Sequence, residues 1–170
     1  MELGTLCSSV KQLFNISSID ELGKNLLENL SNNEVLDSFC KMVDNDLSKD
    51  WLQMIFQYYE ADRVEKKQDY TPKSLARLIA RIAKGQNEIT DMCAGSGALT
   101  IQCWNENPNA KFTLYELDEA VIPYLLFNLV IRNIDATVYR SNILTKEIFE
   151  TYRIEKSDKF GKVVFENGNK

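Results

Sequence analysis

The chain has 170 residues, 44% of them hydrophobic, and a formal net charge of −5. This length suffices for one sizeable hydrophobic core and is short for two. The sequence contains no histidine, and no two of its four cysteines are spaced as Cys-x-x-Cys. This composition argues against zinc fingers, cysteine–histidine nucleophiles and serine–histidine–aspartate triads, and we expect no bound metal.

The cysteines are far apart and have apolar neighbours, which is typical of small core residues in a reducing compartment. The N-terminus carries no basic segment followed by an apolar run, so we expect no signal peptide. The longest apolar run, residues 121–130, is interrupted by Pro123 and Asn128 and is about half the length needed to span a bilayer. We therefore expect a soluble, cytoplasmic protein without a membrane partner.

Residues 1–67 are predicted to form a helical N-terminal region. Apolar side chains recur at helical spacing in three segments, 19–30, 35–47 and 51–67. Such stripes indicate the packing faces of a small helical bundle and suggest no chemistry of their own. The remainder, residues 68–170, is predicted to form an α/β domain.

A further helix is predicted to begin at Thr71 and Pro72. A threonine hydroxyl at the N-cap satisfies a free backbone N–H, and a proline at the first helical position has no N–H to lose. Gly85 is expected to end this helix. Its buried stripe is expected to consist of four apolar residues, Leu75, Leu78, Ile79 and Ile82.

Basic residues gather around this predicted helix although the chain is acidic. Residues 62–84 contain seven lysines and arginines against three acidic residues. A local basic surface of this kind is compatible with a nucleic-acid contact. A solvated helix face explains the same charges equally well, so DNA is a possible partner on this evidence.

From Glu88 onward, strand and helix patterns alternate. Alternation of this kind predicts parallel strands joined by right-handed crossovers, with helices covering the sheet. Ligands of such sheets bind beyond the carboxyl ends of the strands, where Asp91, Glu116 and Asn142 lie. The predicted strands are 88–92, 111–115, 136–140 and 162–165, and the predicted helices are 97–105, 118–132 and 144–152.

The first of these strands runs into a glycine turn, with Gly95 and Gly97 one residue apart. Glycines permit a sharp bend and a close approach by a ligand, which then faces the N–H groups of the helix start. A generic loop is the alternative, because a lone Gly-x-Gly has low specificity. The residues that accompany this turn in the sequence decide whether it is a ligand-binding turn or a generic loop.

Glu116 closes the second strand, 19 residues after Gly97. A carboxylate at that position can accept hydrogen bonds from both ribose hydroxyls of an adenosine-containing cofactor. A helix cap is the alternative role, but Asp118 fills it better. A dinucleotide is less expected, because the third glycine of its fingerprint would fall on Thr100. S-adenosyl-L-methionine fits best.

Three segments, in this order and spacing, resemble the adenine-N6 DNA methyltransferases. They are Tyr70-Thr71-Pro72, the turn from Asp91 to Leu99, and Tyr115-Glu116-Leu117. The similarity is greatest to the modification (M) subunits of type I restriction-modification systems and to related solitary methylases. It covers about residues 68–167, and the helical first third resembles the region that precedes the catalytic domain in those subunits. The resemblance implies a Rossmann-like, S-adenosylmethionine-dependent methyltransferase sheet.

The same resemblance implies a role for each matching segment. Tyr70, Thr71 and Pro72 would lie against the methionine part of the cofactor. The turn would cradle the amino acid moiety, and Glu116 would hold the ribose. The implied cofactor-binding residues are Tyr70, Thr71, Pro72, Asp91, Cys93, Ala94, Gly95, Gly97, Glu116, Asn142 and Ile143.

Asn142 stands where the family usually has the acid of Gly-Asp-x-Leu, which accepts a hydrogen bond from the adenine amino group. An amide oxygen can still accept this bond but supplies no charge. We therefore hypothesise that this chain binds the cofactor more weakly than the family's usual acid would allow.

The end of the chain departs from the family pattern. A stretch like 158–165 normally leads into Asn-Pro-Pro followed by Tyr or Phe, which binds the flipped adenine. Here the sequence reads Asn167-Gly168-Asn169-Lys170, so only the asparagine matches. We assign no catalytic residue, and we expect an incomplete sheet, shortened after the fourth strand. The uncovered sheet edge predicts a homo-oligomer or a complex with restriction-modification partner subunits.

Two functions from different classes stay open. The first is part of a DNA adenine-N6 methyltransferase from a restriction-modification, phage or mobile-element context. The second is a catalytically silent relative that binds the cofactor, DNA or a protein complex as a regulator. A methyltransferase for RNA, protein or a small molecule is a more remote third.

Overall fold

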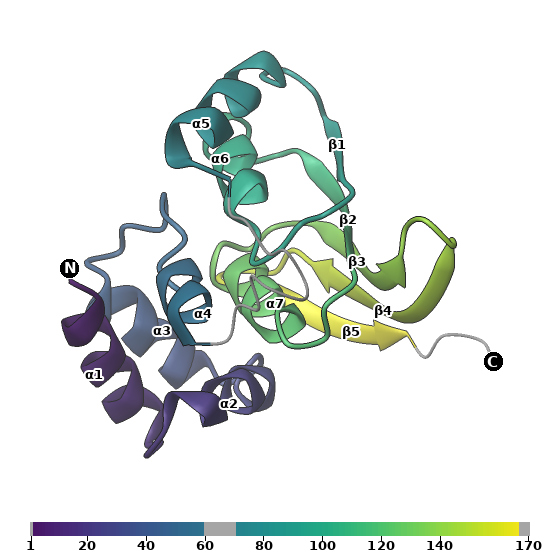
Figure 1. Ribbon diagram of the computed structural model, residues 1–170. Helices are drawn as coiled ribbons and strands as arrows, with labels where there is room; N and C mark the ends of the chain where they lie inside the picture. Colours follow the sequence, from purple (N-terminus) through teal and green to yellow (C-terminus); the bar gives the residue numbers. More distant parts are fainter. Residues whose placement is uncertain (1, 60–70, 167–170) are drawn as a thin grey trace.

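The computed structural model describes residues 2–59 and 71–166 (Figure 1). These residues form helices on one side and a twisted sheet on the other. The helices are α1 (Leu3–Phe14), the short 3-10 helix η1 (Ile19–Glu21), α2 (Leu22–Glu28), α3 (Asn33–Met42), α4 (Gln53–Tyr59), α5 (Lys73–Ile82), α6 (Ala98–Glu106) and α7 (Ile122–Ile131). The strands are β1 (Glu88–Asp91), β2 (Lys111–Glu116), β3 (Ala136–Asn142), β4 (Glu147–Glu155) and β5 (Lys162–Glu166).

The helical prediction for the first third is confirmed over the described residues. Local signals start these helices: Ser18 and Glu21 form a capping box at η1, and the Asn32 side chain accepts a hydrogen bond from the Val35 N–H at the start of α3. The predicted helix 51–67 is present as α4 as far as Tyr59. Its remainder lies outside the described residues.

The sheet has five strands in the order β1-β2-β3-β4-β5. Strands β1, β2 and β3 are parallel, as predicted, and α6 and α7 form the crossovers between them. The expectation of parallel strands is wrong for the rest of the sheet, because β4 and β5 are antiparallel to their neighbours. The predicted strand 162–165 is therefore the fifth strand rather than the fourth. The architecture is a Rossmann-like sheet of the α/β class, preceded by helices.

The predicted helix 144–152 is wrong, because residues 144–146 form a turn and residues 147–152 lie in β4. Five of the nine residues 147–155 are β-branched or aromatic, which favours a pleated strand; they are Ile148, Phe149, Thr151, Tyr152 and Ile154. The chain also reverses directly after β3, where Lys146 adopts a positive φ of 62°. A reversal this short joins antiparallel strands and leaves no room for a helical crossover.

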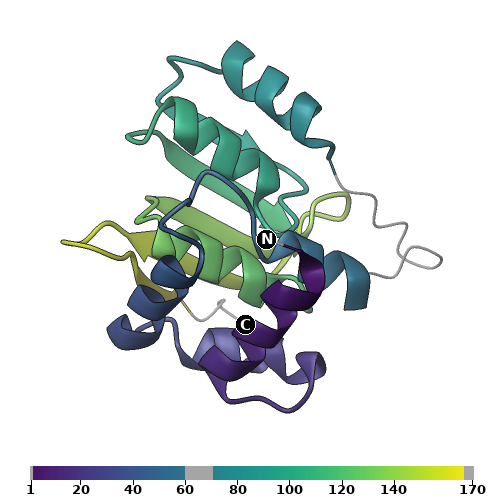
Figure 2. The ribbon, with the colours of Figure 1, turned by 90° about the vertical axis from the view of Figure 1, so that its left-hand side faces the viewer.

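All the helices lie on one side of the sheet (Figures 1 and 2). Alternate residues of β2 and β3 point toward them and are buried, including Phe112, Leu114 and Val138. The residues between these are half-buried on the opposite face, where the rings of Tyr115 and Tyr139 stack with their centroids 5.1 Å apart. No described element covers that face.

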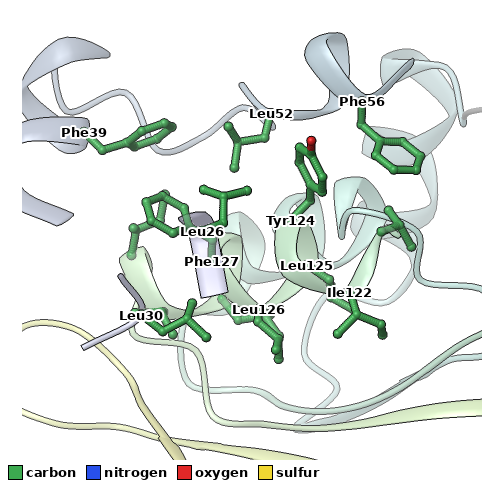
Figure 3. Packing of buried hydrophobic residues seen from close by; sticks show 14 of the residues in the cluster. Leu26, Leu30, Phe39, Leu52, Phe56, Ile122, Tyr124, Leu125, Leu126 and Phe127 are labelled. Atoms are coloured by element: carbon green, nitrogen blue, oxygen red, sulfur yellow. The ribbon is translucent and has the colours of Figure 1, made fainter. Parts of the chain in front are cut away.

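Helix α7 forms the middle layer, and all ten of its residues are buried. The Phe127 ring makes edge contacts with Phe14 and Phe39, at centroid distances of 5.9 and 5.1 Å. The Tyr124 ring contacts Phe56 at 5.0 Å in the same way (Figure 3). The N-terminal helices and the sheet therefore share one continuous hydrophobic core.

Two expectations about α5 are wrong. The helix begins at Lys73 with Pro72 at its N-cap, so Thr71 is not the cap. Its buried residues are Ala76 and Ala80, because small side chains allow α5 to approach α6 closely. The expected stripe is instead largely exposed, with Leu75, Leu78 and Ile82 at 45%, 55% and 75%.

Within the described part of the chain, no helix has both the length and the apolar character needed to cross a membrane.

Replacing Phe127 by alanine should lower the free energy of unfolding by about 3–5 kcal/mol, because the cavity would open where three layers meet. The matched control Leu78→Ala, on the exposed face of α5, should cost less than about 1 kcal/mol. Urea denaturation followed by circular dichroism measures both. Equal losses for the two variants would contradict the shared core.

Candidate functional site

Three polar residues end the three parallel strands. Asp91 is the last residue of β1, Glu116 of β2 and Asn142 of β3. Because these strands run in the same direction in adjacent positions, their carboxyl ends meet at one end of the sheet. The structure thus brings together the residues that the sequence placed at the strand ends.

The glycine turn after β1 has a fixed backbone path. The Ala94 N–H donates to the Tyr115 carbonyl at 3.0 Å, which ties the turn to the end of β2. Gly95 and Gly97 have φ values of +56° and +95°, a region that other residues rarely adopt. A Cβ at Gly97 would also lie 3.0 Å from Leu125 Cδ1, on α7. The positive φ favours glycine at position 97, and the Leu125 methyl group leaves little room for a Cβ there.

Glu116 holds this turn through its carboxylate. Its Oε2 accepts from the Gly95 N–H, and its Oε1 accepts from the Leu117 and Asp118 N–H groups, all at 2.8 Å. A carboxylate has about four acceptor positions, and these described donors fill three. Asp118 accepts from the Ala120 N–H at 3.2 Å and so shapes the approach to α7. Glu116 therefore joins β1 to β2 and keeps acceptor capacity toward a ligand.

Partial burial shifts the pKa of two side chains in the turn, Asp91 and the surface residue Cys93. It raises the pKa of Asp91, an effect partly offset by the hydrogen bond that Asp91 accepts from the Cys93 N–H at 3.2 Å. It also raises the pKa of the Cys93 thiol, and the neighbouring carboxylates of Glu116 and Asp91 raise it further. A thiol held protonated in this way is a poor nucleophile, so the turn is suited to binding rather than to covalent chemistry.

At the end of β3, the Asn142 side chain is engaged locally. Its Oδ1 accepts from the backbone N–H groups of Leu144 and Thr145, at 3.1 and 3.3 Å. The amide thereby fixes the reversal into β4, and the half-buried Ile143 lies inside that reversal. Contact of either residue with an adenine ring stays a prediction.

The Thr-Pro segment lies near the residue that follows the glycine turn. Thr71 lines a cavity of about 80 Å³ together with Asp50 and with Ala98, the residue that follows Gly97. Pro72 is exposed beside it. Tyr70, the third predicted residue of this segment, lies outside the described residues, as does Asn167.

Sequence reasoning missed a contact beneath the turn. The Ser96 hydroxyl donates to Asp50 Oδ2 at 2.6 Å, and the two residues are only 2% and 8% exposed. The Asn128 amide donates to Asp50 Oδ1 and to the Ser96 carbonyl, at 2.9 Å each. One signal for this contact was present in the sequence, because Asn128 interrupts the longest apolar run.

Replacing Gly97 by alanine should lower the free energy of unfolding by about 1–3 kcal/mol, because alanine is strained at this positive φ and would crowd Leu125. The control Gly4→Ala lies in α1 with no atom within 4 Å of the new Cβ, and it should cost nothing or stabilise by up to about 1 kcal/mol. Thermal and urea unfolding measure both. A Gly97→Ala variant as stable as the parent protein would refute the described turn.

The sequence was compared with models of known protein families. The family model described as N-6 DNA Methylase matches residues 42–167, about three quarters of the chain. A search of curated proteins and a search of solved structures each gave no match. The matched segment includes the glycine turn, all the strand ends and the Asp50 contact. The chain thus belongs to the N-6 DNA methylase family and is a DNA adenine methyltransferase-like protein.

Proposed function

We propose that this chain binds S-adenosyl-L-methionine at the carboxyl ends of β1, β2 and β3, as the cofactor-binding part of a DNA adenine-N6 methyltransferase. The observation that carries the proposal is the glycine turn, which the Glu116 carboxylate holds at the Gly95 N–H. When bound, the cofactor supplies an electrophilic methyl group on a positively charged sulfur. The family membership of the chain supports DNA adenine as the acceptor.

The charge of the site supports this cofactor over a dinucleotide. Between Glu88 and Ala110 the sequence contains no lysine or arginine, whereas Asp91 and Glu116 add two carboxylates. Arg140, the register partner of Glu116, donates to Glu150 at 2.6 Å, so its charge is already balanced. A pyrophosphate would meet carboxylates here, whereas the sulfonium and ammonium groups of S-adenosylmethionine would be stabilised by them.

Each predicted residue has a proposed role. Glu116 accepts from a ribose hydroxyl at the acceptor position that its three backbone donors leave. Asp91 with the turn Cys93-Ala94-Gly95 and Gly97 holds the amino acid moiety. Asn142 and Ile143 contact the adenine. Tyr70, Thr71 and Pro72 lie against the methionine part, which fits the cavity that Thr71 shares with Ala98.

Two surfaces support the proposed partners. Lys73, Arg77 and Arg81 are exposed along α5, where DNA phosphates can pair with them. Strand β1 is an edge of the described sheet and pairs with β2 alone. An open edge favours pairing with a second copy of the chain or with a restriction-modification subunit.

Calorimetric titration with S-adenosylmethionine tests the binding. The protein should bind it, and Glu116→Ala should weaken binding at least about tenfold, the effect of losing a hydrogen bond to a charged group. Glu119→Ala is the matched control, because this neighbouring carboxylate is 81% exposed, and it should leave binding unchanged. Absence of binding by the unmodified protein would overturn the proposal.

A parallel assay with tritiated cofactor and unmodified DNA separates the two functions. Transfer of label to DNA supports a methyltransferase. Binding without transfer selects the catalytically silent regulator.

Asn142→Asp should strengthen cofactor binding by up to about tenfold, because a charged acceptor makes a stronger hydrogen bond to the adenine amino group. Aspartate can keep both local hydrogen bonds that Asn142 Oδ1 accepts, so the reversal into β4 should survive. Calorimetry compares the parent protein with Asn142→Asp and Asn142→Ala. Identical affinities for all three would remove Asn142 from the site.

A further inference from the structure

We propose that Asp50 is a positioning residue that fixes the glycine turn through Ser96, so that the segment before α4 sets the affinity for the cofactor. The inference rests on the proposed function and extends it to a residue 46 positions away from the turn in sequence. Asp50 does not need to touch the cofactor, because it acts through a serine that is itself buried.

The contacts immobilise Ser96 from two sides. Its hydroxyl donates to Asp50 Oδ2 at 2.6 Å, and its carbonyl accepts from Asn128 at 2.9 Å. Ser96 stands between Gly95 and Gly97, the two residues with the greatest backbone freedom in the turn. Holding the middle residue therefore restricts the backbone torsions of both glycines, whose N–H groups donate to Glu116 and to the Ala94 carbonyl. Binding then costs less conformational entropy.

Asp50 is itself held firmly. Its Oδ1 accepts from the Gln53 N–H, which caps the start of α4, and from the Asn128 amide, both at 2.9 Å. The buried Arg132 guanidinium donates to Asn128 Oδ1 at 2.9 Å and to the carbonyls of Leu47 and Lys49 at 2.8 and 2.6 Å. The buried acid thus lies in a chain of hydrogen bonds that includes an arginine of opposite charge.

Burial lowers the pKa of Arg132 to about 10, and the nearby Asp50 opposes this effect. The guanidinium therefore stays charged at neutral pH. Burial raises the pKa of Asp50, whereas the hydrogen bond from Ser96, the charge of Arg132 and the hydrogen bond from Asn128 oppose this shift. Arg132 thus offsets part of the cost of burying this carboxyl group. A buried charged network of this kind fixes one position of the segment before α4 relative to the glycine turn. An apolar contact would tolerate several positions.

A separate contact on the same segment supplies the control. The Gln102 and Asn105 side chains donate to the Ser48 carbonyl at 2.9 and 3.0 Å, so they also fasten the segment to α6. The control therefore replaces both residues, and the variant Gln102→Ala below also carries Asn105→Ala. Gln102 has no described contact with Asp50 or Ser96. A merely structural effect of loosening the segment should follow from Gln102→Ala as well, whereas an effect through Ser96 should not.

The experiment compares the full chain with Asp50→Asn, Ser96→Ala, their double variant and Gln102→Ala. Asparagine keeps the shape of Asp50 but cannot accept all three hydrogen bonds. The first readout needs no ligand: hydrogen exchange of the Gly97 amide, which donates to the Ala94 carbonyl at 2.9 Å, followed by NMR. Asp50→Asn and Ser96→Ala should each speed this exchange about tenfold relative to amides of α7. Gln102→Ala should leave it unchanged.

The second readout is the affinity for S-adenosylmethionine. Asp50→Asn should weaken binding about tenfold in the parent protein and less than about twofold in the Ser96→Ala background, because both changes remove the same contact. Additive losses, or an equal loss in Gln102→Ala, would overturn the role of Asp50. Unchanged exchange at Gly97 would overturn it whether or not the cofactor binds. Failure of the parent protein to bind, with exchange responding as expected, would refute only the proposed function.

Discussion

The buried hydrogen-bond network of Asp50, Ser96, Asn128 and Arg132 is the constraint on which the rest of the structure depends. It lies where the segment before α4, the glycine turn and α7 meet, and it places opposite charges inside an otherwise apolar core. Removing one member would leave a buried polar group unpaired, at a cost of about 1–3 kcal/mol or more. The N-terminal helices are therefore part of the framework of the site.

The hydrophobic core follows from the same arrangement. Because α7 is buried on all sides, it needs a cover on the face opposite the sheet, and α1, α3 and α4 provide it with Phe14, Phe39 and Phe56 (Figure 3). The sheet beneath α7 then presents the carboxyl ends of three parallel strands at one end. Packing thus determines where Asp91, Glu116 and Asn142 come together.

Local backbone requirements made the glycine turn and the ends of β1 and β2 predictable from sequence. Gly95 and Gly97 predict a turn with positive φ. Glu116 ends the next strand, 19 residues after Gly97. Asp50 was not predictable, because its side chain resembles an ordinary helix cap and its partner Ser96 is distant in sequence. The sequence pattern of alternating strands and helices does not predict β4, because the alternation ends after β3. Ile148, Phe149 and Tyr152 nevertheless favour a strand. The buried face of α5 was missed because alanines, rather than leucines, allow the approach to α6.

The central proposal is that S-adenosylmethionine binds at the carboxyl ends of β1, β2 and β3. A crystal structure of the chain with S-adenosylhomocysteine, the demethylated product, tests it most directly. We expect a ribose hydroxyl within hydrogen-bond distance of Glu116 and the amino acid moiety against the Gly95–Gly97 backbone. A ligand bound elsewhere, or one that leaves Glu116 without a ribose contact, would contradict it.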